Sequence, residues 1–228
     1  MVASCLDTGC EKMHLRISPQ RDWRSAPTLI WMNGGPGSTS LYGLFLEHGP
    51  FRVGPDGNLS RRRLTWASKY NIIYIDQPVG TGFSFTDSDE GYAKNQTDVA
   101  RDLYEFSRQF YRIFPELLDN DLYVTGESYA GKYVPALAHK IHTENEKGNK
   151  PQIPLKGIAI GDGLCDPLNQ AGLADFLFDT GLLDNPDRKK LQEMEVNATE
   201  AVKNKDWTTA TDVSSEKASS IQFLHSIT

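Results

Sequence analysis

The chain has 228 residues, of which 39% are hydrophobic and 24% are charged, and its formal net charge is -6. This is ordinary globular composition, and the length suits one domain or part of a larger one. The acidic balance argues against nucleic acid and against an anionic membrane surface as partners. No apolar run approaches the roughly 20 residues that span a bilayer.

The N-terminal stretch MVASCLDTGCEKMHLRIS lacks the basic start and apolar core of a signal peptide, and we expect none in it. Three cysteines leave two redox settings open, either one free thiol in a secreted protein or full reduction in the cytosol. They are Cys5, Cys10 and Cys165, and their spacing predicts no metal site. Sequons begin at Asn58, Asn95 and Asn197, an excess that weakly favours the secretory pathway over unmodified surface asparagines.

The predicted elements alternate between strands and helices. TLIWM (28–32) predicts a buried strand that runs into a glycine-rich loop, and NIIYID (71–76) predicts a second strand. Apolar residues recur every three or four positions over 94–114, which indicates a helix that Pro115 ends. DLYVTG (121–126) follows as a third strand.

The remaining pattern continues this alternation and then stops. A helix is expected from the end of the third strand to about His142, LKGIAIGDG (155–163) predicts a fourth strand, and 173–183 is helical. Beyond residue 185 the sequence is polar and helix-prone, then rich in serine and threonine over 208–220, and no further strand is legible. Alternating strands and helices predict a mostly parallel sheet flanked by helices, with ligands beyond the carboxyl ends of its strands.

A serine follows the third strand in LYVTGESYAGKYVP (122–135). The pattern is G-x-S-x-A-G, and alanine is small enough to let strand and helix approach at a turn that displays the Ser128 hydroxyl. The helix start offers the Tyr129 N–H to a developing oxyanion. A strand–turn–helix junction with an incidental serine is the alternative.

A second loop, WMNGGPGSTS (31–40), follows the first strand. Its glycines allow the backbone to lie against a ligand, and such a loop supplies the other oxyanion N–H in hydrolases of this architecture. It lacks the Gly-Lys-Ser/Thr ending of a phosphate-binding loop. The two loops, in this order, favour acyl transfer by serine, which needs no cofactor.

Five blocks together resemble the serine carboxypeptidases, the group of yeast carboxypeptidase Y, and within it the animal vitellogenic-like branch. They are WMNGGPGSTS, LEHGPF, IDQPVGTGFSF, GESYAGKYVP and GIAIGDGLCDP, within about residues 26–185. The resemblance implies a partial α/β-hydrolase fold that is incomplete at both ends. It divides the chain into an atypical N-terminal segment (1–25), a hydrolase core (26–166) and a helical insertion region with a polar tail (167–228).

The resemblance also implies roles for matching residues. Ser128 would be the nucleophile, and the N–H groups of Gly35 and Tyr129 would form the oxyanion hole. Three residues would hold the free carboxylate of the substrate, and two would brace them by hydrogen bonds. The first set is Asn33, Gly34 and Glu127, and the second is Trp31 and Glu47.

Glu127 indicates how binding would depend on pH. Two carboxyl groups at hydrogen-bond distance cannot both stay ionised, so Glu127 and the substrate carboxylate would share a proton. Binding would weaken as pH rises, which predicts an acidic optimum. The plant acyltransferase relatives tend to carry Asp at this position, so Glu127 favours the peptidases.

The base and the acid of a catalytic triad are not legible. In this architecture both follow the serine along the chain. His139 and His142 lie too far along the helix after Ser128, and His225 follows no predicted strand. His48 is expected to be structural, and Lys132 is expected to be a solvated position on the helix.

The resemblance predicts a serine-type carboxypeptidase, secreted or lysosomal/vacuolar, that acts on peptide or protein C-termini. Because the family continues beyond the point where this sequence stops, we expect this chain to be inactive or weakly active. The alternatives are a non-catalytic protein that binds C-terminal carboxylates and an esterase or acyltransferase of the same fold.

Overall fold

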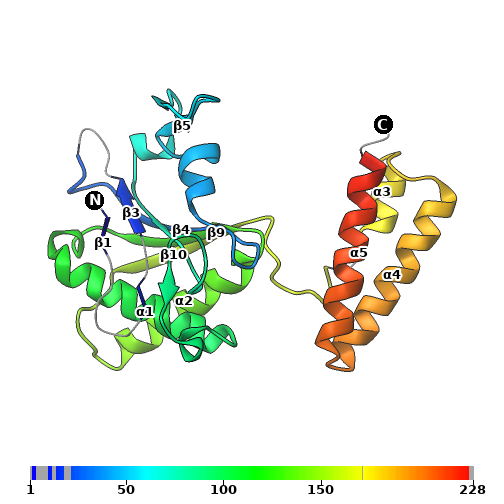
Figure 1. Cartoon of the computed structure of the whole chain (residues 1–228). Coiled ribbons are helices and arrows are strands. Elements are labelled where there is room, and N and C mark those ends of the chain that lie inside the picture. The colour runs from blue at the N-terminus through cyan, green and yellow to red at the C-terminus, as the bar shows by residue number, and fades with distance from the viewer. Residues whose placement is uncertain (1, 4–9, 12–13, 18–21, 171, 226–228) are drawn as a thin grey trace. The chain divides into compact units, whose positions relative to one another are not determined.

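The computed structural model describes residues 2–3, 10–11, 14–17, 22–170 and 172–225 (Figure 1). The chain divides into two compact units, Met1–Gly163 and Leu164–Thr228, whereas the sequence placed the boundary at 166. Cys5 and part of the stretch expected to hold no signal peptide lie outside the described residues, as do the side chains of Cys10 and His225.

The first unit is built on a six-stranded sheet with the order β1-β3-β7-β4-β9-β10. The strands are β1 (Val2–Ala3), β3 (His14–Ile17), β4 (Thr28–Met32), β7 (Asn71–Ile75), β9 (Leu122–Glu127) and β10 (Leu155–Gly161). The four strands from β7 to β10 are parallel, and β3 and β1 pair antiparallel at one edge. The parallel part confirms the expected α/β architecture.

The antiparallel edge lies in the segment expected to be atypical, and no strand was predicted there. Strand β3 pairs with β7 from His14 opposite Ile75 to Ile17 opposite Ile72. Short edge strands carry too little alternation to be recognised from sequence, and their pairing is decided by the partner strand.

The central strands send alternate side chains to two separate cores. All five residues of β4 are buried, as expected of a strand covered on both faces. Ile30 and Met32 belong to one core, whereas Leu29 and Trp31 belong to the other. This alternation puts Trp31 and the residue two places on, Asn33, on one side of the sheet.

The two long helices, α1 (Gln96–Ile113) and α2 (Ala130–Glu146), pack together on the Ile30 face (Figure 1). Helix α1 begins where the Asn95 side chain accepts a hydrogen bond from the N–H of Asp98 at 2.9 Å. It ends before Pro115, as predicted, because the residue before a proline is disfavoured in the helical conformation.

The Trp31 face is covered by short elements. Helix η1 (Gly43–Glu47), a single π-helical turn, contributes Leu44, and η2 (Trp66–Ser68) contributes Ala67. The remaining elements of this unit are short. They are β2 (Cys10–Glu11) paired with β8 (Phe85–Thr86), the hairpin of β5 (Phe51–Val53) and β6 (Leu59–Arg61), η3 (Asp89–Gly91) and η4 (Pro115–Leu117).

The second unit consists of α3 (Ala174–Asp179), α4 (Asn185–Lys203) and α5 (Trp207–His225). Its small core is centred on Ala174, Leu183, Leu191 and Met194. The serine- and threonine-rich stretch 208–220, for which no element was predicted, lies within α5. None of the described helices is long and apolar enough to cross a membrane.

Candidate active site

Ser128 lies on a sharp turn between β9 and α2. Its φ of 58° is in the left-handed region, which is unfavourable for a residue with a side chain. The turn is held by the Ser128 N–H, which donates to the Gly161 carbonyl at 3.0 Å, and the side chain is exposed. Gly126 and the buried Ala130 flank it so closely that a Cβ at Gly126 would clash with the Ala130 methyl. This is the elbow expected of a nucleophilic serine.

The glycine loop lies directly against this elbow. A Cβ on Gly34 would collide with the N atom of Tyr129, the Glu127 carbonyl and the Ser128 Cβ. Gly35, next in the loop, has a φ of 105° that favours glycine. The structure thus brings Gly34 against Ser128 and Tyr129, with Gly35 next to it in the loop.

The Asn33 side chain joins the glycine loop to the glutamates. Its Nδ2 donates to Glu47 Oε1 at 3.0 Å and to Glu127 Oε1 at 2.9 Å. Its Oδ1 accepts from Trp31 Nε1 at 2.9 Å and from the N–H of Gly43 at 3.2 Å. Two donors on the oxygen leave the amide nitrogen only one orientation, toward the two carboxyl groups.

The two glutamates form a closely coupled pair. Burial raises the pKa of Glu47, the hydrogen bond from Asn33 opposes this rise, and the nearby carboxyl groups of Glu127 and Asp162 add to it. Seven of the eight residues proposed from the sequence lie at the carboxyl ends of β4 and β9 or on the turns that follow, and the eighth, Glu47, ends η1 and joins them through Asn33.

Two buried residues that were not proposed hold the glycine loop. The Asp76 carboxylate accepts from Thr39 Oγ1 at 2.6 Å, from the Ser40 N–H at 3.0 Å and from the Phe83 N–H at 3.0 Å. Ser40 Oγ donates to the Ile75 carbonyl at 2.6 Å and accepts from the Asn33 N–H at 3.2 Å. The sequence signal that could have pointed to Asp76 is an acidic residue directly after the buried strand β7.

The three histidines whose side chains the structure describes, His48, His139 and His142, lie away from Ser128. His139 and His142 are exposed on α2, and His142 contacts Glu146 at 3.4 Å. At about 1.5 Å per residue, both lie more than about 10 Å along the helix from the elbow. His48 packs behind Glu47 and faces the Tyr74 hydroxyl at 3.2 Å. The described residues contain no cluster of three or more acidic, histidine or cysteine side chains that could hold a metal ion.

The family model described as "Serine carboxypeptidase" matches residues 13–226. The chain belongs to the serine carboxypeptidase family. The match begins inside the segment 1–25 and includes strand β3, so the family pattern starts earlier than the sequence motifs indicated.

Named serine carboxypeptidases are similar to this chain at high identity. "Venom serine carboxypeptidase" of Apis mellifera is 50% identical over 195 residues, which is 86% of this chain and 42% of that protein. "Probable serine carboxypeptidase CPVL" of Homo sapiens is 50% identical over 189 residues, and "Vitellogenic carboxypeptidase" of Aedes aegypti is 46% identical over 190. Each alignment spans 82–83% of this chain and 40% of the relative. The resemblance to the vitellogenic-like branch is confirmed.

A solved carboxypeptidase structure shares the fold. The structure of Kex1(delta)p, a prohormone-processing carboxypeptidase from Saccharomyces cerevisiae, superposes with a TM-score of 0.81 at 30% identity. The alignment covers 94% of this chain and 49% of that one. Proline iminopeptidase of Mycobacterium smegmatis, at 16% identity and a TM-score of 0.50, shows a likeness of fold alone.

Proposed function

We propose that this chain carries the nucleophile and the carboxylate-binding site of a serine carboxypeptidase, which releases C-terminal residues through an acyl-enzyme. The observation that carries the proposal is the Asn33 amide, which bridges Glu47 and Glu127 beside the elbow of Ser128. A general serine hydrolase needs the elbow and the oxyanion donors but has no need for a pair of carboxyl groups next to them. The pair fits a substrate whose reacting bond lies one residue from a free carboxylate.

In this proposal each part has one task. The Ser128 hydroxyl attacks the scissile carbonyl, and the N–H groups of Gly35 and Tyr129 bind the oxyanion. The substrate carboxylate binds at Asn33, Gly34 and Glu127, where a shared proton removes the repulsion between carboxylates.

Affinity for a C-terminal carboxylate is expected to fall as pH rises. Since the pKa of Glu47 is raised by burial and by its acidic neighbours, the pair keeps a proton above the usual range of glutamate. Loss of that proton leaves two or three negative charges around Asn33. The proposed site therefore works best under acidic conditions, which fits a lysosomal or vacuolar setting.

The remaining part of such a machinery is a general base for Ser128. His48, His139 and His142 are not hydrogen-bond partners of Ser128 in the part of the chain that the structure describes. Serine attack without a base loses several orders of magnitude in rate. We therefore propose that this chain by itself binds C-terminal carboxylates but turns peptides over slowly.

The experiment combines labelling, binding and turnover on the full chain. A fluorophosphonate probe tests Ser128, with Ser128→Ala as the control. Calorimetry at about pH 5 compares a blocked dipeptide acid with its C-terminal amide, and an assay follows release of the C-terminal residue. Tighter binding of the dipeptide acid than of its amide supports the proposal. Release of the C-terminal residue would show in addition that a general base is present. Equal affinity for acid and amide, or cleavage of esters but not of peptides, would contradict it.

We further propose a secretory route for the protein. The three sequon asparagines, Asn58, Asn95 and Asn197, are all exposed, and the similar Apis mellifera protein is named as a venom component. Expression in a secreting eukaryotic cell, followed by mass measurement before and after glycosidase treatment, tests this. Complete absence of a mass change would contradict the route.

A further inference from the structure

His48 lies within a cluster of aromatic rings behind Glu47. Its imidazole stacks on Trp66 with centroids 4.2 Å apart and 20° between the planes, and it lies 5.7 Å from the Tyr74 ring at 25°. It meets Trp31 edge to face, with centroids 4.3 Å apart at 79°. The His48 ring is thus in contact with the indole whose N–H holds the Asn33 amide.

The backbone around His48 is held by the segment that follows strand β6. The His48 carbonyl accepts from Thr65 Oγ1 at 2.8 Å and from the Trp66 N–H at 3.1 Å. The Arg62 guanidinium donates to two carbonyls on either side of this turn, at 3.0 and 3.1 Å. Because Glu47 precedes His48 directly, the same contacts fix the turn that carries the glutamate.

The surroundings keep the His48 ring neutral. Burial, followed by the charge of Arg62, lowers the pKa of His48 to about 4. Its Nδ1 faces the Tyr74 hydroxyl at 3.2 Å, while Nε2 is buried and has no hydrogen-bond partner among the described residues. A proton on Nε2 would be a buried donor without an acceptor, which is costly. The attraction between an imidazolium and the Trp66 indole opposes this cost but does not overcome it.

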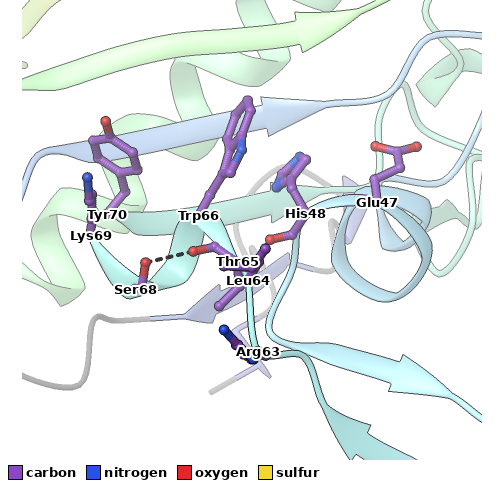
Figure 2. A pocket seen from close by; sticks show the side chains of 9 residues that line it. All are labelled: Glu47, His48, Arg63, Leu64, Thr65, Trp66, Ser68, Lys69 and Tyr70. Atoms are coloured by element: carbon purple, nitrogen blue, oxygen red, sulfur yellow. Dashed lines mark hydrogen bonds between the residues drawn. The ribbon is translucent and has the colours of Figure 1, made fainter.

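One side of the cluster lines a pocket of about 550 Å³ (Figure 2). His48 and Glu47 contribute to its wall, together with Arg63 and Lys69. The charge that acts on the imidazole is the cation of Arg62, whereas Glu47, on the same turn, and Arg63 and Lys69 line the pocket beside it. The pocket gives protons from solvent a route to the histidine.

We propose that His48 is a positioning residue of the carboxylate-binding network. Its neutral ring holds the Trp31 indole in the orientation that directs the Asn33 amide at Glu47 and Glu127. This inference rests on the proposed function of the network. When His48 takes up a proton, the charged ring draws water, the stack loosens and the amide loses its fixed orientation. Affinity for C-terminal carboxylates then falls at the acid end of the pH range, opposite to the alkaline loss caused by Glu47.

The test measures the affinity of the full chain for a blocked dipeptide acid and for its C-terminal amide, by calorimetry from about pH 3.5 to about pH 7. His48→Ala removes the ring, and we expect about a tenfold loss of affinity for the acid at about pH 6, equivalent to about 1.4 kcal/mol. The amide should be little affected. His48→Phe keeps a ring that cannot take up a proton. The His48→Phe variant should bind the acid within about threefold of the wild-type affinity at about pH 6. Its affinity should not show the decline that the wild type is expected to show below about pH 4.5.

Each outcome is decisive. If the wild-type chain binds neither ligand, or binds both equally, the proposed function fails and not this inference alone. If the wild type prefers the acid and His48→Ala keeps that preference, or if His48→Phe loses as much as His48→Ala, the positioning role is wrong. Ile141→Val, in the core on the opposite face of the sheet, controls for general loosening and should leave the acid-to-amide ratio unchanged. Circular dichroism confirms that each variant is folded.

Discussion

Replacing Asp76 by asparagine tests how the glycine loop is held. In the native chain one carboxylate oxygen of Asp76 accepts from Thr39 Oγ1 and from the Ser40 N–H, and the other accepts from the Phe83 N–H. The residue is buried, at 2% exposure. Asparagine has the same shape but only one acceptor oxygen, so its NH2 group must face one of these donors.

The magnitude follows from the bonds that are lost. If the amide oxygen keeps the Thr39 and Ser40 bonds, the Phe83 N–H loses a bond to a charged acceptor, which is worth about 1.5–3 kcal/mol. Two donors then face each other, and the remaining two bonds become weaker because their acceptor is neutral. Removal of a buried charge returns part of this energy. We expect Asp76→Asn to lower the free energy of unfolding by about 2–3 kcal/mol.

The assay is urea unfolding of the full chain, followed by the fluorescence of tryptophans in the first unit. The control is Asp119→Asn, an exposed acid for which a change within about 0.5 kcal/mol is expected. A loss below about 1 kcal/mol in Asp76→Asn would refute the reasoning, because it would mean that the three bonds to Asp76 contribute little.

Three further predictions concern the site itself. Ser128→Gly should be more stable than Ser128→Ala by about 0.5–1 kcal/mol in urea unfolding, because only glycine relieves the left-handed φ. Gly34→Ala should cost about 1–3 kcal/mol and abolish fluorophosphonate labelling, whereas Gly172→Ala, with open space around it, should do neither. The pKa of Glu47 is raised in the folded state, so the folded chain binds this proton more tightly than the unfolded chain does. The free energy of unfolding should therefore fall as pH rises above the usual pKa of a glutamate. Thermal melts of Glu47→Gln should lack that decline.

The central fold could be predicted from the sequence because its strands are buried on both faces. TLIWM is an uninterrupted apolar run between polar turns, and β4 has the predicted bounds of 28–32. The helix predicted for 94–114 spans Gln96–Ile113, since its apolar positions recur with the helical period. Strand β3 and helix α5 were missed because a four-residue edge strand and a serine-rich helix have weak local patterns. Their structure depends on the elements against which they pack.

The residues of the candidate site also fall into those that the local sequence predicts and those that it does not. Ser128 and Gly34 lie in motifs whose backbone demands are visible locally, in a turn after a strand and in a run of glycines. Asp76 and His48 act through contacts with segments distant in the sequence, and the local sequence pattern around them does not predict those contacts. The orientation of the Asn33 amide depends on donors from a strand and a π-helical turn, which only the folded sheet brings together.

The bridge of Asn33 to Glu127 joins residues 94 positions apart in the chain. Strand β4 leaves the ribosome long before β9, yet in the finished sheet β9 is its direct neighbour. At a synthesis rate of about 5–20 residues per second, the edge of β4 that will receive β9 waits for several seconds. During this time a buried apolar strand has an open edge, so the chain is most exposed to aggregation while the site is still absent. A ligand for the carboxylate pair cannot assist these early steps, because its binding site is completed only when β9 is in place.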